Sequence, residues 1–278
     1  MPYRTVNGIQ MYYTDWGTGR PVVLVHGWCI SSDSWEYVIN GLCKHSLRCV
    51  AMDLRGCGRS EHPYSGHDYD TLADDLLGLL TELDLREAVL VGHSMGGGVI
   101  TRYLARHGQE RVAGAVLIGT TTPFLLKTED NPDGVDKSYF DAMVDDIERD
   151  RPQYVENLAP GFFGQHLPNY MTSPELVRWG VGLTLQASAR AAVEMLRANS
   201  ETDQRSELKS ILTPTLLLHG DSDQSCPLEI TARSTHALMP CSTLKIYENV
   251  AHGSYITHAT QISGDIAEFV RELRWIGY

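Results

Sequence analysis

The sequence predicts an α/β fold with a mostly parallel central sheet, helices on both faces of that sheet, and an inserted helical cap. Short apolar runs alternate with amphipathic helical patterns along most of the 278 residues, as they do in βαβ units. Most of these runs are apolar throughout, which is typical of strands buried on both faces. The alternation stops near residue 120 and resumes near residue 209. We therefore predict core segments at 1–119 and 209–278, and a helical cap at 120–208.

The first core segment has five expected strands, at residues 9–16, 21–26, 48–53, 88–91 and 112–119. The last four are continuous apolar runs, whereas residues 9–16 have the composition of a strand. Helices are expected between them at residues 34–43, 69–85 and 95–107. The second of these helices is the clearest, because its leucines fall on one face: Leu72, Leu76, Leu79, Leu80 and Leu83.

The cap is expected to contain several helices, among them residues 137–149 and 174–198, and no strand comparable to those of the core. The alternation then returns with strands at 213–219 and 242–247 and helices at 228–238 and about 257–274. A helical block inserted between two strands of a parallel sheet is expected to cover one end of that sheet.

Charge and hydropathy exclude several classes of partner and location. Lys plus Arg is 23 and Asp plus Glu is 35, a net charge of −12. Such an acidic surface repels phosphate backbones and anionic lipid, so neither nucleic acid nor a membrane is an expected partner. The sequence has neither an apolar run long enough to span a bilayer nor a secretory signal pattern. We expect a cytoplasmic protein, with a homodimer as the weakest of these expectations.

The six cysteines are scattered and form no C-x-x-C pair, so we expect reduced and mostly buried thiols. The histidines also lack the spacing of metal ligands. No metal and no cofactor is therefore expected. The cysteines are Cys29, Cys43, Cys49, Cys57, Cys226 and Cys241.

The segment Gly92–Gly96 is a G-x-S-x-G that lies directly between an expected strand and an expected helix. In this context the glycines allow a sharp turn that projects the hydroxyl of Ser94 from the carboxyl end of the sheet. The same turn places the amide of Met95 at the start of a helix, where it can stabilise developing negative charge. The alternative is a turn serine that caps the helix.

A serine nucleophile needs a histidine base and an acid that orients it. Two carboxylates, Asp221 and Asp223, lie in the loop after the strand at 213–219, and both are candidates for the acid. His252 follows the next strand and precedes a glycine, where a base can reach the serine. His258 falls near the start of the last helix and is expected to have a packing or capping role. The order Ser, Asp, His at three strand ends fits a hydrolase arrangement.

The loop at Val25–Trp28 follows another buried strand, and Gly27 lets it turn sharply. Such a loop can direct the amide of Trp28 toward the oxygen beside Ser94 and complete a two-donor oxyanion hole with Met95. The alternative is an ordinary βα turn.

Together these residues resemble the α/β-hydrolase fold superfamily, and within it the branch of cofactor-free haloperoxidases and bacterial aryl esterases. The resemblance implies Ser94 as nucleophile, His252 as base, and Asp223 as acid, because the family spaces the acid four residues before a proline, here Pro227. It departs at Cys29, where haloperoxidase-like members usually carry proline, and this favours plain ester hydrolysis. The resembling stretches are 26–28, 32–35, 53–60, 92–97, 103–108, 218–221, 252–253 and 257–258.

We therefore expect a serine hydrolase that cleaves a carboxylic ester of a small apolar substrate through an acyl-enzyme, with activity rising through roughly pH 6 to 7 as the histidine loses its proton. A lactone or amide substrate, a perhydrolase or haloperoxidase activity, and a hydrolase-like ligand receptor are the alternatives. His26 and His93 are expected to be structural neighbours of the site. The expected pocket residues are Cys29, Phe124, Phe140, Phe162 and Trp179.

Overall fold

The computed structural model describes residues 2–274, and these form an eight-stranded sheet in the order β1-β2-β4-β3-β5-β6-β7-β8. The pairs β1–β2 and β2–β4 are antiparallel, and all the others are parallel. The expected mostly parallel sheet is therefore confirmed. The strands are β1 (Tyr3–Val6), β2 (Ile9–Trp16), β3 (Arg20–Val25), β4 (Leu47–Met52), β5 (Ala88–His93), β6 (Val112–Ile118), β7 (Thr215–Gly220) and β8 (Ser242–Tyr247). Only β1 has no counterpart among the expected strands.

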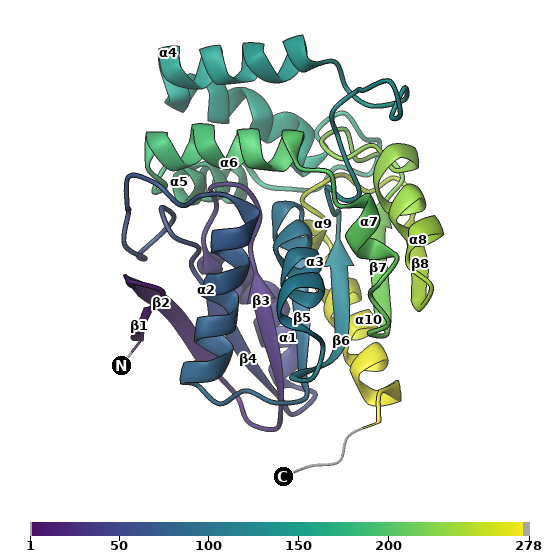
Figure 1. Ribbon diagram of the computed structural model, residues 1–278. Helices are drawn as coiled ribbons and strands as arrows, with labels where there is room; N and C mark the ends of the chain where they lie inside the picture. The colour runs from purple at the N-terminus through teal and green to yellow at the C-terminus, as the bar shows by residue number, and fades with distance from the viewer. Residues whose placement is uncertain (1, 275–278) are drawn as a thin grey trace.

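Helices cover both faces of the sheet, as the sequence predicts. Helices α2 (Tyr69–Glu82) and α3 (Met95–His107) pack together on one face, and α1 (Glu36–Cys43) and α10 (Ala259–Glu272) pack together behind it (Figure 1). The contact between α2 and α3 requires a glycine, because a Cβ at Gly98 would lie 2.5 Å from the hydroxyl of Tyr69. Helix α2 therefore packs closely on the first turns of α3, next to the strand-to-helix turn at Ser94.

Residues between β6 and β7 form four helices: α4 (Lys137–Phe163), α5 (Pro174–Thr184), α6 (Ala189–Glu201) and α7 (Arg205–Leu208). Helices α4, α5 and α6 lie across the end of the sheet toward which β6 points (Figure 1). This placement agrees with a helical cover, whereas the division of the chain at residues 119 and 208 stays a prediction.

Helix boundaries in this block differ from the sequence expectation for local reasons. Helix α4 continues to Phe163, with non-helical dihedral angles at Asp150. The Asp150 carboxylate accepts a hydrogen bond from the Gln153 amide at 3.1 Å and so caps the second half of the helix. The stretch 174–198 is two helices, because the hydroxyl of Ser188 accepts a hydrogen bond from the Ala191 amide and begins α6.

The last part of the chain is also more segmented than its apolar pattern suggests. The expected helix at 228–238 is a π-helical turn, Glu229–Arg233, followed by α8 (Ser234–Leu238). The final helix begins earlier than expected, as α9 (Ser254–Thr257), and α10 follows it after His258. A 3₁₀ turn, Ser32–Trp35, precedes α1.

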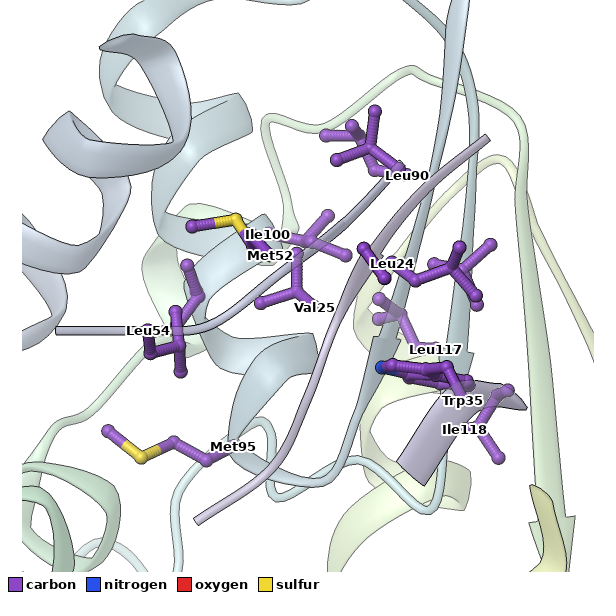
Figure 2. Packing of buried hydrophobic residues seen from close by; sticks show 14 of the residues in the cluster. Leu24, Val25, Trp35, Met52, Leu54, Leu90, Met95, Ile100, Leu117 and Ile118 are labelled. Atoms are coloured by element: carbon purple, nitrogen blue, oxygen red, sulfur yellow. The ribbon is translucent and has the colours of Figure 1, made fainter. Parts of the chain in front are cut away.

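The core lies between the sheet and its helices, and Figure 2 shows side chains of β3, β5 and β6 interleaved there. Strand β5 is buried along its whole length, which is why its sequence reads as a continuous apolar run. All six cysteines are free, and four of them are buried, in agreement with the expectation. Within residues 2–274 no helix has both the length and the apolar character needed to cross a membrane.

Candidate active site

Ser94 lies at the junction between β5 and α3 in a backbone conformation that an L-residue seldom adopts, with φ 54° and ψ −121°. The turn is tight enough to require its flanking glycines. A Cβ at Gly92 would lie 2.5 Å from the carbonyl oxygen of Gly96, and a Cβ at Gly96 would lie 2.3 Å from that of Val25. Strained residues of this kind persist where the surrounding structure holds them, and they cluster at functional sites. The geometry is that of a nucleophile turn.

Asp223 and His252 are hydrogen-bonded to each other, with 2.7 Å between His252 Nδ1 and Asp223 Oδ2. The other carboxylate oxygen of Asp223 accepts hydrogen bonds from the backbone amides of Ser225 and Cys226, at 2.9 and 2.8 Å. Three donors therefore fix the carboxylate, which orients the imidazole so that Nε2 is its free nitrogen.

Asp221 is engaged elsewhere. Its carboxylate is exposed and accepts hydrogen bonds from the backbone amide of Asn249 at 2.8 Å and from the Ser222 hydroxyl at 2.9 Å. It therefore ties the β7 loop to the loop after β8. The structure thus brings Asp223 to the histidine and leaves Asp221 in a turn.

The backbone around His252 is held from two sides. The ring of His93 donates through Nε2 to the His252 carbonyl at 3.1 Å, since a carbonyl oxygen can only accept. At the end of β6, a Cβ on Gly119 would lie 3.2 Å from His252 Nδ1 and 3.3 Å from Asp223 Oδ2. The Asp–His pair therefore packs directly against the backbone at the end of a neighbouring strand, and a larger residue there would press on it.

Opposing effects set the pKa of His252. Burial lowers it, whereas the carboxylate of Asp223, and the thiol of Cys226 in its ionised form, raise it, and the net result is a pKa well above the ordinary value of 6.5. The neutral, basic form of the ring is therefore populated at higher pH than the sequence-based expectation of roughly 6 to 7. His93 has the opposite shift, because burial lowers its pKa well below 6.5.

Cys226 is the residue of this site that sequence reasoning did not single out. Its sulfur lies within 4.8 Å of a ring nitrogen of His252 and of a carboxylate oxygen of Asp223. Burial raises the pKa of the thiol. The sequence signal for Cys226 was its position three residues after Asp223. The amides that bind the Asp223 carboxylate belong to the same short loop, so a carboxylate that contacts the histidine brings this loop with it.

The loop after β3 lies against Ser94. A Cβ at Gly27 would lie 3.0 Å from both the Ser94 Cβ and His93 Nδ1. The next residue, Trp28, donates from its indole nitrogen to the Ala192 carbonyl of α6 at 2.9 Å. Its partner in the expected oxyanion hole, Met95, is the first residue of α3, so its amide is one of those that have no acceptor within the helix.

The chain is similar to known proteins along nearly its whole length. The alpha/beta hydrolase fold family matches residues 20–259. The chain belongs to the α/β-hydrolase fold family. A non-heme haloperoxidase of Rhodococcus erythropolis is 39% identical over 274 residues, which cover 97% of this chain and 99% of that protein. A bifunctional esterase/perhydrolase of Acinetobacter calcoaceticus is 38% identical over 272 residues, 96% of this chain and 98% of the relative.

Solved structures agree. An esterase from Exiguobacterium antarcticum superposes with a TM-score of 0.91 at 31% identity, covering 97% of this chain and 99% of the esterase chain. The chain is thus an α/β hydrolase of the cofactor-free haloperoxidase and esterase branch. The names of these relatives support ester hydrolysis or a haloperoxidase-like activity.

Among the five pocket residues expected for this α/β hydrolase, Phe162 has a ring that contacts His252. Its ring centroid is 5.7 Å from that of His252 and 6.1 Å from that of His93, edge-on in both cases. Its carbonyl accepts a hydrogen bond from the Gly253 amide at 2.8 Å. Phe162 therefore joins the end of α4 to the histidine loop.

The other four have different surroundings. Cys29 is buried beside Trp28 with a positive φ of 54°, and its thiol interacts with that of Cys57. Phe124 stacks under the Arg205 guanidinium at 5.3 Å. Phe140 is buried against Tyr139, and Trp179 packs edge-on against Tyr37 of α1. Within residues 2–274, the aromatic and cation–π contacts of Phe124, Phe140 and Trp179 are with residues other than His252.

Two further histidines occupy the structural positions expected of them. His26 is buried, accepts a hydrogen bond from the Leu54 amide at 2.9 Å, and donates to the Gly27 carbonyl at 2.8 Å, so it joins the β3 and β4 loops. His258 lies between α9 and α10, and its Nδ1 is 2.8 Å from the Thr257 hydroxyl.

Proposed function

We propose that this α/β hydrolase is a serine esterase that cleaves carboxylic esters of small apolar substrates. The observation that carries the proposal is the hydrogen-bonded pair of His252 and Asp223. This pair packs against Gly119, and the carbonyl of the preceding residue, Ile118, binds the Ser94 amide at 2.9 Å. A serine on a strained strand-to-helix turn, a histidine base and an orienting carboxylate are the parts that acyl transfer requires. The esterase names of two relatives agree with this chemistry.

The reaction follows from these positions. The oxygen of Ser94 attacks the ester carbonyl while His252 Nε2 takes the serine proton, and the same ring then gives that proton to the departing alcohol. Water next attacks the acyl-enzyme with His252 again as base, and the carboxylate product leaves. Asp223 keeps Nδ1 protonated throughout and stabilises the imidazolium that forms in each step.

The oxyanion of each tetrahedral intermediate needs donors that already point at it. We assign this role to the backbone amides of Trp28 and Met95, which belong to the two turns that meet at Ser94. The position of Met95 at the start of a 13-residue helix adds the favourable end of the helix dipole.

The preference for a small apolar substrate rests on Phe162, whose ring makes a T-shaped contact with that of the histidine. Aromatic and aliphatic walls with a few convergent polar groups are typical of sites for such ligands.

The test compares wild type with Ser94→Ala on short-chain p-nitrophenyl esters over many turnovers. Continuous release of p-nitrophenol that falls at least ~10³-fold in the variant would support the proposal. Release that stops after one equivalent would instead indicate a ligand receptor that traps its acyl group. A Ser94→Ala variant as active as wild type would overturn the assignment of the nucleophile.

Perhydrolysis is the second candidate, because relatives bear haloperoxidase and perhydrolase names. In that reaction hydrogen peroxide replaces water in the attack on the acyl-enzyme and gives a peracid. Formation of peracetic acid from acetate and peroxide, dependent on Ser94, would support this candidate. Hydrolysis of acetate esters without any peracid formation would exclude perhydrolysis and leave ester hydrolysis as the activity.

A further inference from the structure

Three potential metal ligands lie together in the site and come from two loops. A carboxylate oxygen of Asp223, the sulfur of Cys226 and a ring nitrogen of His252 are all within 4.8 Å of one another. All three residues are buried, and the fold brings the cysteine to the histidine although 25 residues lie between them in the sequence. The esterase mechanism uses the carboxylate and the imidazole, and it assigns no role to the thiol.

The thiol is held in place by the backbone of its own residue. The amide of Cys226 donates to Asp223 at 2.8 Å, and its carbonyl accepts from His219 Nε2 at 2.8 Å. These two bonds hold the residue where its sulfur lies within 4.8 Å of a ring nitrogen of His252. The protein therefore already holds a sulfur ligand and an imidazole ligand close together, as a soft metal ion requires.

We propose that Cys226 and His252 form an inhibitory binding site for a thiophilic divalent cation such as Zn²⁺ or Cd²⁺. The ligands are Cys226 Sγ and His252 Nε2, with the Ser94 hydroxyl or water completing the coordination shell. Thiolate and imidazole are the donors that these cations prefer.

Asp223 acts in this site from behind the imidazole. Its bond to His252 Nδ1 is the carboxylate–histidine contact that orients metal-bound imidazoles and strengthens them as donors. The same hydrogen bond that prepares the ring as a base therefore prepares it as a ligand.

Binding is an exchange of a proton for a metal ion and involves no electron transfer. The thiol of Cys226 releases its proton to solvent, the sulfur and Nε2 donate electron pairs to the cation, and chelation of the cation restores the thiol. Because the cation takes the lone pair with which His252 accepts the serine proton, the occupied site cannot carry out acyl transfer.

The first test measures Cd²⁺ binding to the whole chain by equilibrium dialysis and by the thiolate-to-cadmium charge-transfer absorption. It is made in a Cys241→Ser background, because Cys241 is the one cysteine that is exposed. We expect one tightly bound Cd²⁺ with a thiolate band, both lost in Cys226→Val and Cys226→Ser. Removing the orienting carboxylate in Asp223→Asn should weaken binding about 10- to 100-fold.

Two controls make this test decisive. Ser94→Ala should keep the band, since the serine is not a required ligand, whereas His252→Ala should lose tight binding. A band that persists in both Cys226 variants would place the metal on another thiol and overturn the proposal, as would undiminished affinity in His252→Ala. Circular dichroism of each variant shows that the loss of binding is not a loss of fold.

Inhibition is the second measurement, and it rests on the proposed esterase activity, whereas the absorption band does not. Zn²⁺ should inhibit ester hydrolysis in the Cys241→Ser background, and a chelator should restore it. Relative to its own metal-free rate, Cys226→Val should need at least about tenfold more Zn²⁺ for the same inhibition. Equal sensitivity of the two proteins would overturn the inhibitory role, and absent hydrolysis with an intact band would refute only the esterase assignment.

Discussion

The strand ends of the sheet and the helices that cover them position their residues in different ways. At the strand ends, backbone groups hold the reactive side chains: two amides bind Asp223, and the backbone of Gly119 packs against the Asp–His pair. The covering helices contact the site at isolated points, such as the hydrogen bond that the Phe162 carbonyl accepts from the Gly253 amide. We infer that the sheet fixes the chemistry and that the helices shape the space above it.

Variants in the two regions should therefore differ in which kinetic constant they change. Changes at strand ends should lower kcat, because they move groups that act on the transition state. Changes in the covering helices should act mainly on KM and on stability.

The largest effect is expected for Asp223→Asn, which keeps the shape of the acid and removes its charge. The neutral amide stabilises neither the correct tautomer nor the imidazolium, so kcat should fall by about 10⁴-fold. The measurement is steady-state hydrolysis of a p-nitrophenyl ester. Asp221→Asn is the matched control, and it should stay within about threefold of wild type because its carboxylate binds a loop amide. A large loss in Asp221→Asn alone would reverse the assignment of the acid.

The same variant has a defined effect on pH dependence. His252 is active when neutral, so kcat/KM rises with pH through the pKa of the ring, which the Asp223 carboxylate helps to place well above 6.5. Without the carboxylate, burial remains and lowers that pKa. The acid limb of the residual activity should therefore move to lower pH in Asp223→Asn. An unmoved limb would mean that the carboxylate does not act on the titrating group.

Gly119→Ala should have the next largest effect. The new methyl group would lie 3.2 Å from His252 Nδ1 and 3.3 Å from Asp223 Oδ2, and so it should displace the pair and lower kcat about 10- to 100-fold. Gly108→Ala is the control, since Gly108 also has a positive φ but a Cβ there meets nothing within 4 Å. Gly119→Ala should lose about 1 kcal/mol of stability from backbone strain. Gly108→Ala should lose about 1 to 3 kcal/mol, because φ 83° and ψ 177° form a conformation that essentially only glycine adopts. Equal activity in the two would show that the pair tolerates displacement.

The same division explains what could be predicted from the sequence. Buried strands read as apolar runs, and a sharp turn after β5 needs glycines, so the sheet and the position of Ser94 were predictable. Cys226 was missed because its contact with His252 depends on how two loops meet. The aromatic residues of the covering helices could not be sorted, because a ring that packs on Arg205, as Phe124 does, has the same local pattern as one that faces the site.

Trp28→Phe should have the smallest effect, because it removes one contact between the helices and the loop after β3. The indole bond to the Ala192 carbonyl is 2.9 Å, and its loss should cost about 1 kcal/mol of unfolding free energy. The remaining ring can still pack edge-on against Tyr154 of α4. KM should rise a few-fold while kcat changes by less than about twofold, since the Trp28 amide is retained.

Trp179→Phe is the matched control, because its ring contacts Tyr37 on α1 instead of the helix that Trp28 binds. It should leave KM unchanged in the same ester assay, and chemical denaturation of both variants gives the stability difference. If Trp28→Phe lowered kcat as strongly as Gly119→Ala, α6 would be holding the oxyanion loop in its catalytic geometry. The covering helices would then contribute to catalysis. The proposed division, in which strand ends determine kcat and the helices determine mainly KM and stability, would be wrong.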